Sequence, residues 1–400
     1  MRSFNYKARD TTDNKVKKGV VQANSENSAG KLLIERGYVP ILIEEIQEGS
    51  LMAKLNSRIP TKEKIVFTRQ FATLIGAGLP LAQSLRTISE QTSNKALKVV
   101  IDDILGSVES GKSLAESFSK HPDVFDKVYL ALIAAGEVSG TLDDSLRRIA
   151  MQQEKDAAMM GKIYGAMTYP AIVLVVILLV VCFMLFTVVP QVEKLYEDLK
   201  QPLPTLTQVM VNAEQFIISF WWLIIIVLVI AIFFLRQYLK TENGVRTMDT
   251  FKLSVPMFNQ LFKRLYMARF ARTSQILLGT GVAMLDTLSI SSDAVNNVVI
   301  ATSIGNAAEK VKSGKPLSDS LRGEDHIMPL LPQMINIGEQ SGKIDEMLGK
   351  VAQVYEDELD EQIRTISTMI EPILMVFLAV IAGGMVGAIL FPIYALVNTI

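Results

Sequence analysis

Three stretches of the chain carry no charged residue, and they limit the possible fold more than any other feature. They cover residues 171–189, 217–235 and 373–400. A helix over residues 171–189 is about 28 Å long, which matches a hydrocarbon layer about 30 Å thick. Half of the 400 residues are hydrophobic, and the mean hydropathy is +0.31. We therefore expect a membrane protein with three transmembrane helices.

The motif Gly-Glu-x-Ser-Gly occurs twice, at residues 136–140 and 338–342. At an offset of 202 residues these motifs coincide, and two prolines, Pro170 and Pro190, match Pro372 and Pro392. At an offset of 203, earlier positions match: Phe67, Arg69, Leu74, Gly76, Gly78, Leu85, Val108, Gly111 and Lys112 correspond to Phe270, Arg272, Leu277, Gly279, Gly281, Leu288, Val311, Gly314 and Lys315. The pattern predicts a duplicated unit, a soluble bundle followed by a membrane helix that opens at Pro170 or Pro372.

The expected fold class is mainly α. We predict a polytopic membrane protein with two duplicated cytoplasmic six-helix bundles, three transmembrane helices and a small N-terminal α/β module. The predicted segments are 1–48 for the module, 49–60 for a linker, 61–168 for the first bundle, 169–190 for the first transmembrane helix, 191–215 for an extracytoplasmic loop, 216–236 for the second transmembrane helix, 237–370 for the second bundle and 371–400 for the third transmembrane helix.

Local patterns support the soluble parts. In the module, strands are expected around residues 4–8, 16–23 and 39–43, with a helix capped by Asn24-Ser25. In the first bundle, apolar residues recur at helical spacing, as in 97–108. Turn residues separate these patterns, and Ser113 and Thr141 are predicted caps of the following helices.

Basic residues predict the orientation. Six of them follow the second apolar stretch within a short distance: Arg236, Lys240, Arg246, Lys252, Lys263 and Arg264. The predicted loop 191–215 has two lysines and four acids. Because basic residues are retained on the cytoplasmic side, we expect the N-terminus and both bundles in the cytoplasm and the C-terminus outside.

Charge balance and reactive residues argue against several functions. Acidic and basic residues number 41 and 40, so no net charge favours nucleic acid. The single Cys182 allows no intrachain disulfide. His121 and His326 lie in no cluster with metal-ligand spacing. We therefore predict no catalytic residue, no metal site, no cofactor and no nucleic-acid partner.

Residues 106–113 match the phosphate-loop pattern G-x-x-x-x-G-K-S by letters alone. That loop must follow a buried strand so that its amides converge on phosphate, whereas a helical pattern precedes it here. The second copy has Glu309 and Pro316 in place of Gly106 and Ser113. We interpret the segment as a turn between helices; the alternative is an ATPase that Lys112→Ala would inactivate.

The repeated motif has two interpretations. Its glycines permit a close helix approach and a turn with positive φ, and its glutamate can bond free amides. The residues are Gly136, Glu137, Ser139 and Gly140 in the first copy and Gly338, Glu339, Ser341 and Gly342 in the second. The same corner could instead be a docking surface near the membrane. We favour the structural interpretation, because turn glycines are commoner than functional ones.

The third apolar stretch offers candidates for helix packing or for a subunit path. Ala379, Gly383 and Gly387 form a ridge of small residues at helical spacing, which lets membrane helices approach closely. Glu371 lies just before this apolar stretch, where the first copy has Tyr169. This acid either pairs with a positive terminus of a partner helix or is an interfacial acid stabilised by the helix dipole. We favour the second.

The complete pattern resembles a known family. Phe4, Tyr6, Ala8 and Asp10 open the chain, and each bundle has Phe-x-Arg, Gly-x-Gly and Gly-Glu-x-Ser-Gly before an apolar stretch. Over nearly its whole length the chain resembles the inner-membrane platform proteins of type IV pili and type II secretion. One departure is Ala283, where the first copy has Pro80.

The resemblance implies an assembly platform that is no enzyme itself. Its cytoplasmic bundles would contact a hexameric motor ATPase, and its spans would handle pilin or pseudopilin helices among the membrane lipid, with further copies of the chain as partners. Pilus, secretion and DNA-uptake systems stay open. The alternative is a membrane transporter built on internal repeats, although the spans lack the broken polar helices of substrate sites.

Overall fold

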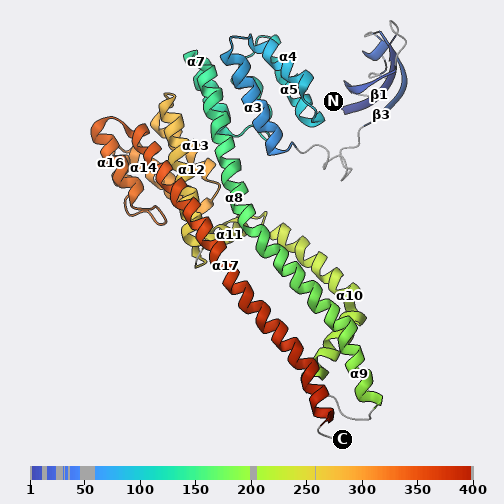
Figure 1. The fold of residues 1–400 in the computed structure, drawn as a ribbon. Helices are drawn as coiled ribbons and strands as arrows, with labels where there is room; N and C mark the ends of the chain where they lie inside the picture. The colour runs from blue at the N-terminus through green and yellow to red at the C-terminus, as the bar shows by residue number, and fades with distance from the viewer. Residues whose placement is uncertain are drawn as a thin grey trace.

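The computed structural model describes residues 2–10, 16–23, 30, 32–34, 37–45, 59–198, 205–256 and 258–397. Two helical bundles lie at one end of the molecule, and long helices extend from them toward the C-terminus at the other end (Figure 1). The predicted fold class is confirmed, with two bundles and three long apolar helices in a mainly α protein.

An antiparallel sheet forms the N-terminal module. The strand β1 (Arg2–Asp10) is central, between β2 (Val16–Ala23) and β3 (Tyr38–Glu45). Tyr6 pairs with Gly19 on one side and with Ile43 on the other. Residues 32–34 are helical. The predicted cap at Asn24-Ser25 and residues 49–58 of the predicted linker lie outside the described residues.

The first bundle consists of short helices and the first part of a long one. They are α3 (Thr61–Gly76), α4 (Leu81–Gln91), α5 (Lys95–Glu109), α6 (Leu114–Ser119), α7 (Lys127–Ser139) and α8 (Leu142–Phe183). Aromatic rings fill its core, and those of Phe118 and Phe125 meet edge-on with centroids 4.5 Å apart. Helices this short are marginal alone, so burial of their apolar faces stabilises them.

The second bundle repeats this arrangement. Its helices are α12 (Asn259–Gly279), α13 (Met284–Val295), α14 (Val298–Lys312), α15 (Leu317–Leu321), α16 (Leu330–Ser341) and α17 (Ile344–Val397). An additional helix, α11 (Glu242–Ser254), precedes them, and Asp249 of α11 accepts a hydrogen bond from Val298 N at 2.9 Å. In the described residues each bundle therefore contains six helices, as predicted.

Two helices run unbroken from the bundles into the apolar stretches. α8 has 42 residues and contains Pro170 in its interior, and α17 has 54 residues and includes Pro372. α8 therefore does not begin at Pro170, and α17 does not begin at Pro372; the membrane boundaries predicted at 169 and 371 stay predictions. A proline removes one backbone hydrogen bond, but membrane helices tolerate it because their surroundings satisfy the freed group.

The predicted extracytoplasmic loop 191–215 is helical over most of its length, and its place outside the membrane stays a prediction. α8 continues through a π-helical segment (Met184–Val188) into α9 (Val189–Asp198), and α10 (Thr205–Tyr238) begins soon after. Tyr196 of α9 and Val211 of α10 are buried. The polar residues of this range suggested a loop, but apolar residues recur among them at helical spacing, as in Val192 and Tyr196.

Two predicted caps have different outcomes. Ser113 Oγ accepts a hydrogen bond from Glu116 N at 3.1 Å, so the cap of α6 is confirmed. Thr141 precedes α8 but makes no side-chain bond to its amides. The Thr141 hydroxyl lies 2.7 Å from Ser139 Oγ instead, because the tight turn between α7 and α8 brings these two hydroxyls together.

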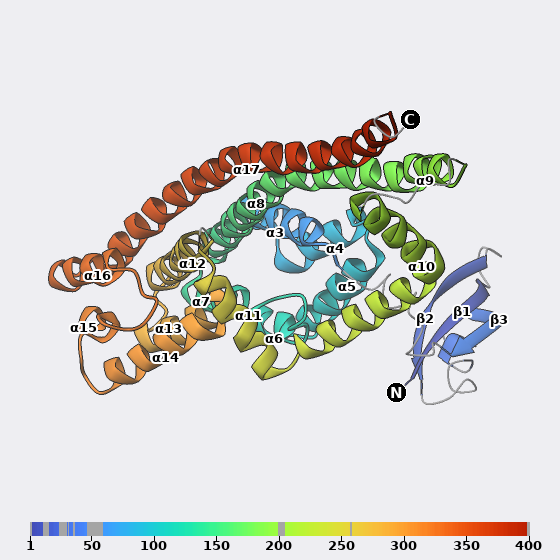
Figure 2. The same cartoon turned by 90° about the horizontal axis from the view of Figure 1, so that it is seen from below.

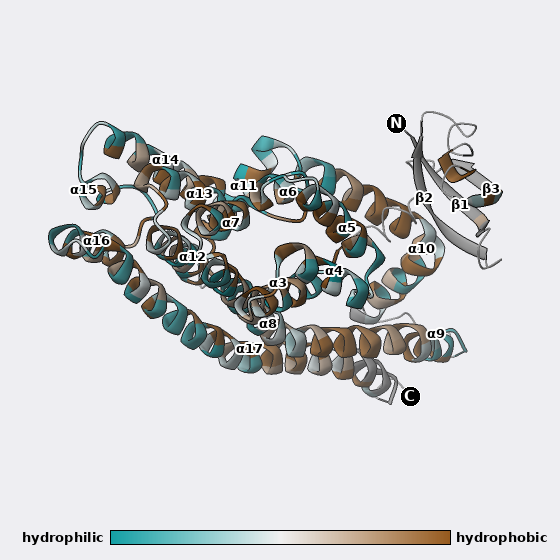
Figure 3. Cartoon of the chain, turned by 90° about the horizontal axis from the view of Figure 1, so that it is seen from above, coloured by the Kyte–Doolittle hydropathy of each residue, from teal (hydrophilic) through white to brown (hydrophobic). Residues whose placement is uncertain are grey.

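Three helices are long and apolar enough to cross a membrane, within the part of the chain that the structure describes. They are α8 with its continuation, α10 and α17. Hydrophobic residues gather along α10 and along the distal parts of α8 and α17 (Figure 3). None of the most apolar residues of α10 is buried inside the protein, as expected for side chains that face lipid.

Candidate functional site: the junction between the bundles

In each copy the glutamate of the repeated motif bonds the first amides of a short helix. Glu137 accepts hydrogen bonds from Leu114 N at 2.7 Å and Ala115 N at 3.0 Å, at the start of α6. Glu339 accepts one from Leu317 N at 2.6 Å, at the start of α15. A carboxylate is favoured there because the free amides of a helix N-terminus carry partial positive charge.

Each glycine of the motif lies where another residue would be either strained or crowded. Gly140 and Gly342 end α7 and α16 with φ of 73° and 70°, a conformation that favours glycine. A Cβ atom at Gly136 would lie 2.5 Å from Ser145 Oγ, and one at Gly338 would lie 2.7 Å from Ile344 Cα. The motif therefore fixes how α7 meets α8 and how α16 meets α17.

The hydroxyls of the motif bond within their own helices. Ser139 Oγ donates to Ala135 O, and Ser341 Oγ donates to Ile337 O, both at 2.7 Å. Each serine hydroxyl thus donates its hydrogen bond to a carbonyl of the preceding helical turn. The glycines, glutamates and serines of the motif therefore all make contacts within the protein.

The segment that matches the phosphate-loop pattern is a turn between helices. α5 ends at Glu109, Gly111 has φ of 88°, and α6 begins at Leu114. The element that leads into the turn is therefore a helix and not a strand. The amides that would face a phosphate already bond the Glu137 carboxylate, and Lys112 Nζ bonds Glu116 Oε1 at 2.5 Å. A phosphate would have to displace a carboxylate that the protein itself supplies.

The predicted residues of the third apolar stretch face outward on α17. Glu371 and Ala379 are exposed. Cβ atoms at Gly383 and Gly387 would meet nothing within 4 Å. The described chain therefore leaves this ridge of small residues uncovered, and it brings none of them near the repeated motif.

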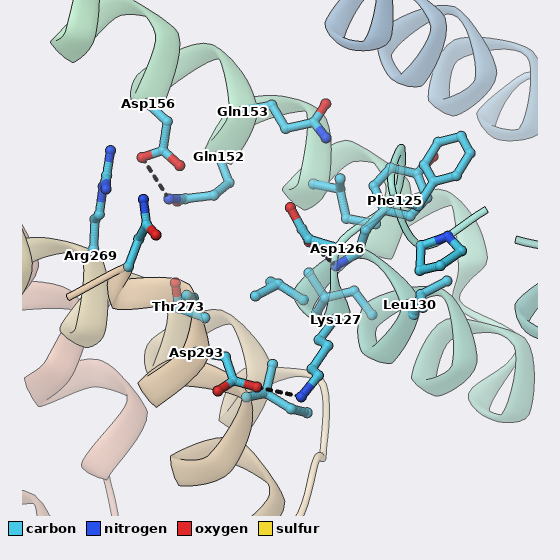
Figure 4. A pocket seen from close by; sticks show the side chains of 18 residues that line it. Phe125, Asp126, Lys127, Leu130, Gln152, Gln153, Asp156, Arg269, Thr273 and Asp293 are labelled. Carbon is cyan, nitrogen blue, oxygen red and sulfur yellow. Dashed lines mark hydrogen bonds and ion pairs between the residues drawn. The ribbon is translucent and has the colours of Figure 1, made fainter. Parts of the chain in front are cut away.

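A cavity of about 720 Å³ lies between the two bundles (Figure 4). α7 and α8 line one side, and α12 and α13 line the other; we call this region the bundle junction. Polar residues face the cavity from both sides: Gln152, Gln153 and Asp156 of α8, and Arg269 and Thr273 of α12.

Hydrogen bonding in the cavity is incomplete. Gln152 Nε2 donates to Asp156 Oδ1 at 3.1 Å. The side-chain oxygens of Gln152 and Gln153 are buried without a hydrogen-bond partner in the described structure, which costs about 1–3 kcal/mol each. Burial raises the pKa of the Asp156 carboxyl, and the Arg269 guanidinium opposes that rise. Asp156 lies on α8 before its uncharged stretch. The polar side chains of the cavity therefore lack part of their hydrogen bonds in the present arrangement.

Ion pairs connect the bundles around the cavity. Lys127 Nζ lies 2.6 Å from Asp293 Oδ2, and Lys162 pairs with Asp360. Lys155 Nζ lies 3.3 Å from Glu356 Oε2. Exposed pairs contribute about 0–1 kcal/mol. These contacts therefore orient the bundles more than they hold them together.

No local pattern in the sequence identifies the bundle junction. The offsets of 202 and 203 residues show which positions correspond, but they do not show where one copy touches the other. The lysines at positions 155 and 162 look like solvated charges on a helix, which is the usual reading of such residues. Their acidic partners are about 200 positions away in the sequence, so no local pattern connects them.

Two family models match the chain. One is described as type II secretion system (T2SS), protein F, and it matches twice, at residues 67–190 and 270–392. The other is described as type II secretion system protein F, N-terminal domain, and it matches residues 1–44. The double match confirms the predicted tandem duplication.

Curated relatives are similar over nearly the whole chain. A type IV pilus assembly protein, PilC, of Thermus thermophilus is 35% identical, and the similarity covers 99% of this chain and 98% of that protein. The PilC protein of Pseudomonas aeruginosa is 36% identical over 92% of this chain and 98% of its own length. A type II secretion system protein F of Vibrio cholerae is 30% identical over 100% of this chain and 99% of its own length.

We expect Glu137→Ala to lower the free energy of unfolding by about 1–3 kcal/mol, because it leaves two part-buried amides of α6 without a partner. Thermal unfolding of the full-length protein in detergent measures this as a lower Tm. Glu116→Ala is the matched control: its side chain is 54% exposed and pairs with Lys112, so a change of at most about 0.5 kcal/mol is expected. Equal Tm values for the two variants would contradict this role of Glu137.

Proposed function

Because this chain belongs to the type II secretion system protein F family, we propose that it is an inner-membrane assembly platform for a type IV pilus or a type II secretion pseudopilus. In this role it couples a cytoplasmic motor ATPase to the insertion of pilin or pseudopilin subunits into the filament, or to their removal. One observation supports this coupling above all: α8 and α17 each pass from a soluble bundle into an apolar stretch without a break.

The two continuous helices provide a physical route for the coupling. At 1.5 Å per residue, α8 is about 63 Å long and α17 about 81 Å long. They lie side by side where they leave the bundles (Figure 2), and Lys162 of α8 pairs with Asp360 of α17 there. A motor that turns or shifts a bundle would thereby move the membrane part of the same helix.

The bundle junction supports movement between the two copies. Its cavity contains buried oxygens without partners, and the ion pairs around it are weak in water. A second arrangement of the bundles that gives these oxygens partners would recover the cost of leaving them unpaired. Nucleotide hydrolysis belongs to the motor in this scheme, and the chain itself is not an enzyme.

The same proposal includes the orientation and the subunit path. Basic residues after α10, among them Arg236 and Lys240, favour cytoplasmic bundles and an external C-terminus. The uncovered ridge at Gly383 and Gly387 would let a pilin or pseudopilin helix approach α17 closely. Glu371, exposed at the entrance of this stretch, would be an interfacial acid beside that path.

Deletion of the gene tests the function directly. We expect loss of surface filaments in electron micrographs, while immunoblots show that the filament subunits are still made and processed. Restoration by the gene in trans is the control. Normal filaments with a defect in secretion or DNA uptake would assign the platform to that system, and normal behaviour in all three assays would contradict the proposal.

Helix continuity is tested at two exposed alanines of α8, Ala157 and Ala158. The double change to glycine weakens the helix by about 1 kcal/mol per residue without loss of packing. We expect far fewer filaments at an unchanged amount of protein in the membrane. The double change to glutamine keeps the helix and should leave filament number normal. Normal filaments with the glycine pair would argue against transmission through α8.

The ridge on α17 is tested by Gly383→Leu with Gly387→Leu. A Cβ atom at either position would meet nothing within 4 Å, so we expect the protein to fold and reach the membrane normally. We expect filament assembly to be blocked, because a partner helix can no longer approach. Val380→Leu, at a position 68% exposed on the same helix, is the control. Normal filaments in the double variant would exclude the ridge from the subunit path.

A further inference from the structure

The two copies bury corresponding faces to different extents. Ile276 and Leu277 of α12 are buried against the core of the first bundle. Their counterparts on α3, at the offset of 203, are Thr73 and Leu74. Thr73 is exposed and Leu74 only half-buried. The face of the second bundle that the first bundle covers is therefore open in the first bundle.

A duplicated ion pair shows the same difference. Arg272 of α12 bonds Glu356 of α17 through two contacts of 2.9 and 2.8 Å, and Lys155 of the first bundle lies over this pair. Its counterpart is Arg69 with Glu154. The side chains of Arg272 and Glu356 are 14% and 16% exposed, whereas those of Arg69 and Glu154 are 65% and 32% exposed.

A groove of about 440 Å³ lies on this uncovered surface. α3 and α8 line it, and we call this surface the open face. Its lining residues include Arg69, Thr73, Gly76, Arg147, Met151 and Glu154. Met151 is 53% exposed, so the groove has an apolar side chain and two cations that nothing in the described chain covers.

We propose that the open face binds the α16 and α17 side of a second copy of this chain. That side is the counterpart of α7 and α8, which cover the corresponding face inside the chain. The new contact would repeat between two chains the packing that the two copies already make within one chain. We therefore use the contact between the two bundles of one chain to derive which residues would meet between two chains.

At one of the corresponding positions the charges are complementary. Lys155 corresponds to Asp357, at the offset of 202, and Asp357 is exposed. In the repeated contact Asp357 reaches the ion pair of Arg69 and Glu154. Asp357 is negative where Lys155 is positive. Asp357 would therefore pair with the cation Arg69, whereas Lys155 pairs with the acid Glu356.

A second pair gives the same result. Inside the chain a Cβ atom at Gly279 would lie 3.5 Å from Arg148 Nη1 and 3.9 Å from Asp345 Oδ2, so the Arg148 side chain extends over Gly279. The counterparts of Arg148 and Asp345 are Lys350 and Asp143. Lys350 of one copy would therefore lie near Asp143 of the other, which again brings opposite charges together.

Apolar residues are exposed on the side that would dock. Ile337 of α16 is 51% exposed and Val354 of α17 is 41% exposed. Their counterparts, Ala135 and Gln152, line the pockets between α7 or α8 and the second bundle. Burial of these two side chains against the open face would add apolar contact to the two charge pairs.

The membrane is compatible with this contact. α8 and α17 both enter their apolar stretches from the bundle side, so two chains with the same orientation can meet by rotation about the membrane normal. The contact joins two different surfaces, which makes it heterologous. After one contact, one chain keeps its open face free and the other keeps its α16 and α17 side free, so the contact can close into a ring or continue.

Cross-linking in membranes tests the contact. Two differently tagged copies lacking the native thiol (Cys182→Ser) are produced together, one with Asp357→Cys and the other with Arg69→Cys. After treatment with a short thiol cross-linker, we expect a product that carries both tags and is absent when either new cysteine is omitted. Lys350→Cys with Asp143→Cys should give the same product.

Val99→Cys is the matched control, because Val99 is 67% exposed on α5 and does not line the open face. Its combination with Asp357→Cys should give no product. A thiol-reactive dye shows that each new cysteine is accessible. Absence of product from both test pairs, or an equal yield from the control, would overturn the proposal. Cross-linking of Arg69→Cys to a different protein would do so as well.

Charge reversal provides an independent measurement. Asp357→Lys places a cation opposite Arg69, so we expect co-purification of the two tagged copies in detergent to fall several-fold. Glu309→Lys changes an acid that is 76% exposed on α14 and should leave co-purification unchanged. Equal recovery of both variants would contradict the pairing of Asp357 with Arg69. These readouts do not depend on filament assembly.

Discussion

A backbone amide or carbonyl that enters the hydrocarbon layer must keep a hydrogen-bond partner, since an unpaired group there costs several kcal/mol. In this chain the helices that satisfy this requirement also extend into the bundles outside the apolar stretches. α8 and α17 stay helical from their first turns in the soluble bundles through Pro170 and Pro372 to their distal ends. Each bundle is therefore attached to the membrane by the same helix that completes its own core.

The attachment is fixed where the long helices begin. At Gly136 and Gly338 the preceding helix approaches the start of α8 or α17 so closely that no side chain would fit. Glu137 of α7 and Glu339 of α16 bond the amides at the start of the helix before their own, α6 or α15. One short motif thus fixes three helices relative to one another in each copy, which explains why it is present in both.

Duplication gave two similar bundles, but the contact between them made the copies different. The pair of Arg272 and Glu356 is enclosed, and the corresponding pair of Arg69 and Glu154 is exposed. Enclosure also changes the side chains that suit each position: Ile276 is buried where Thr73 is exposed. Corresponding surfaces of the two bundles therefore differ in their side chains according to whether another bundle covers them.

Local features of the sequence determined the class of the protein. The three uncharged stretches, the six helices of each bundle and the strands of the N-terminal module follow from composition and periodicity, which depend on neighbouring residues. The duplication follows from the constant offset between matching positions. Pro170 and Pro372 do not interrupt α8 and α17, because the local cost of a proline is outweighed by the helix on both sides. The bundle junction, with Gln152, Asp156 and Arg269, was decided only by tertiary structure: these residues lie on different copies, and their contact depends on how two complete bundles pack, which no local pattern encodes.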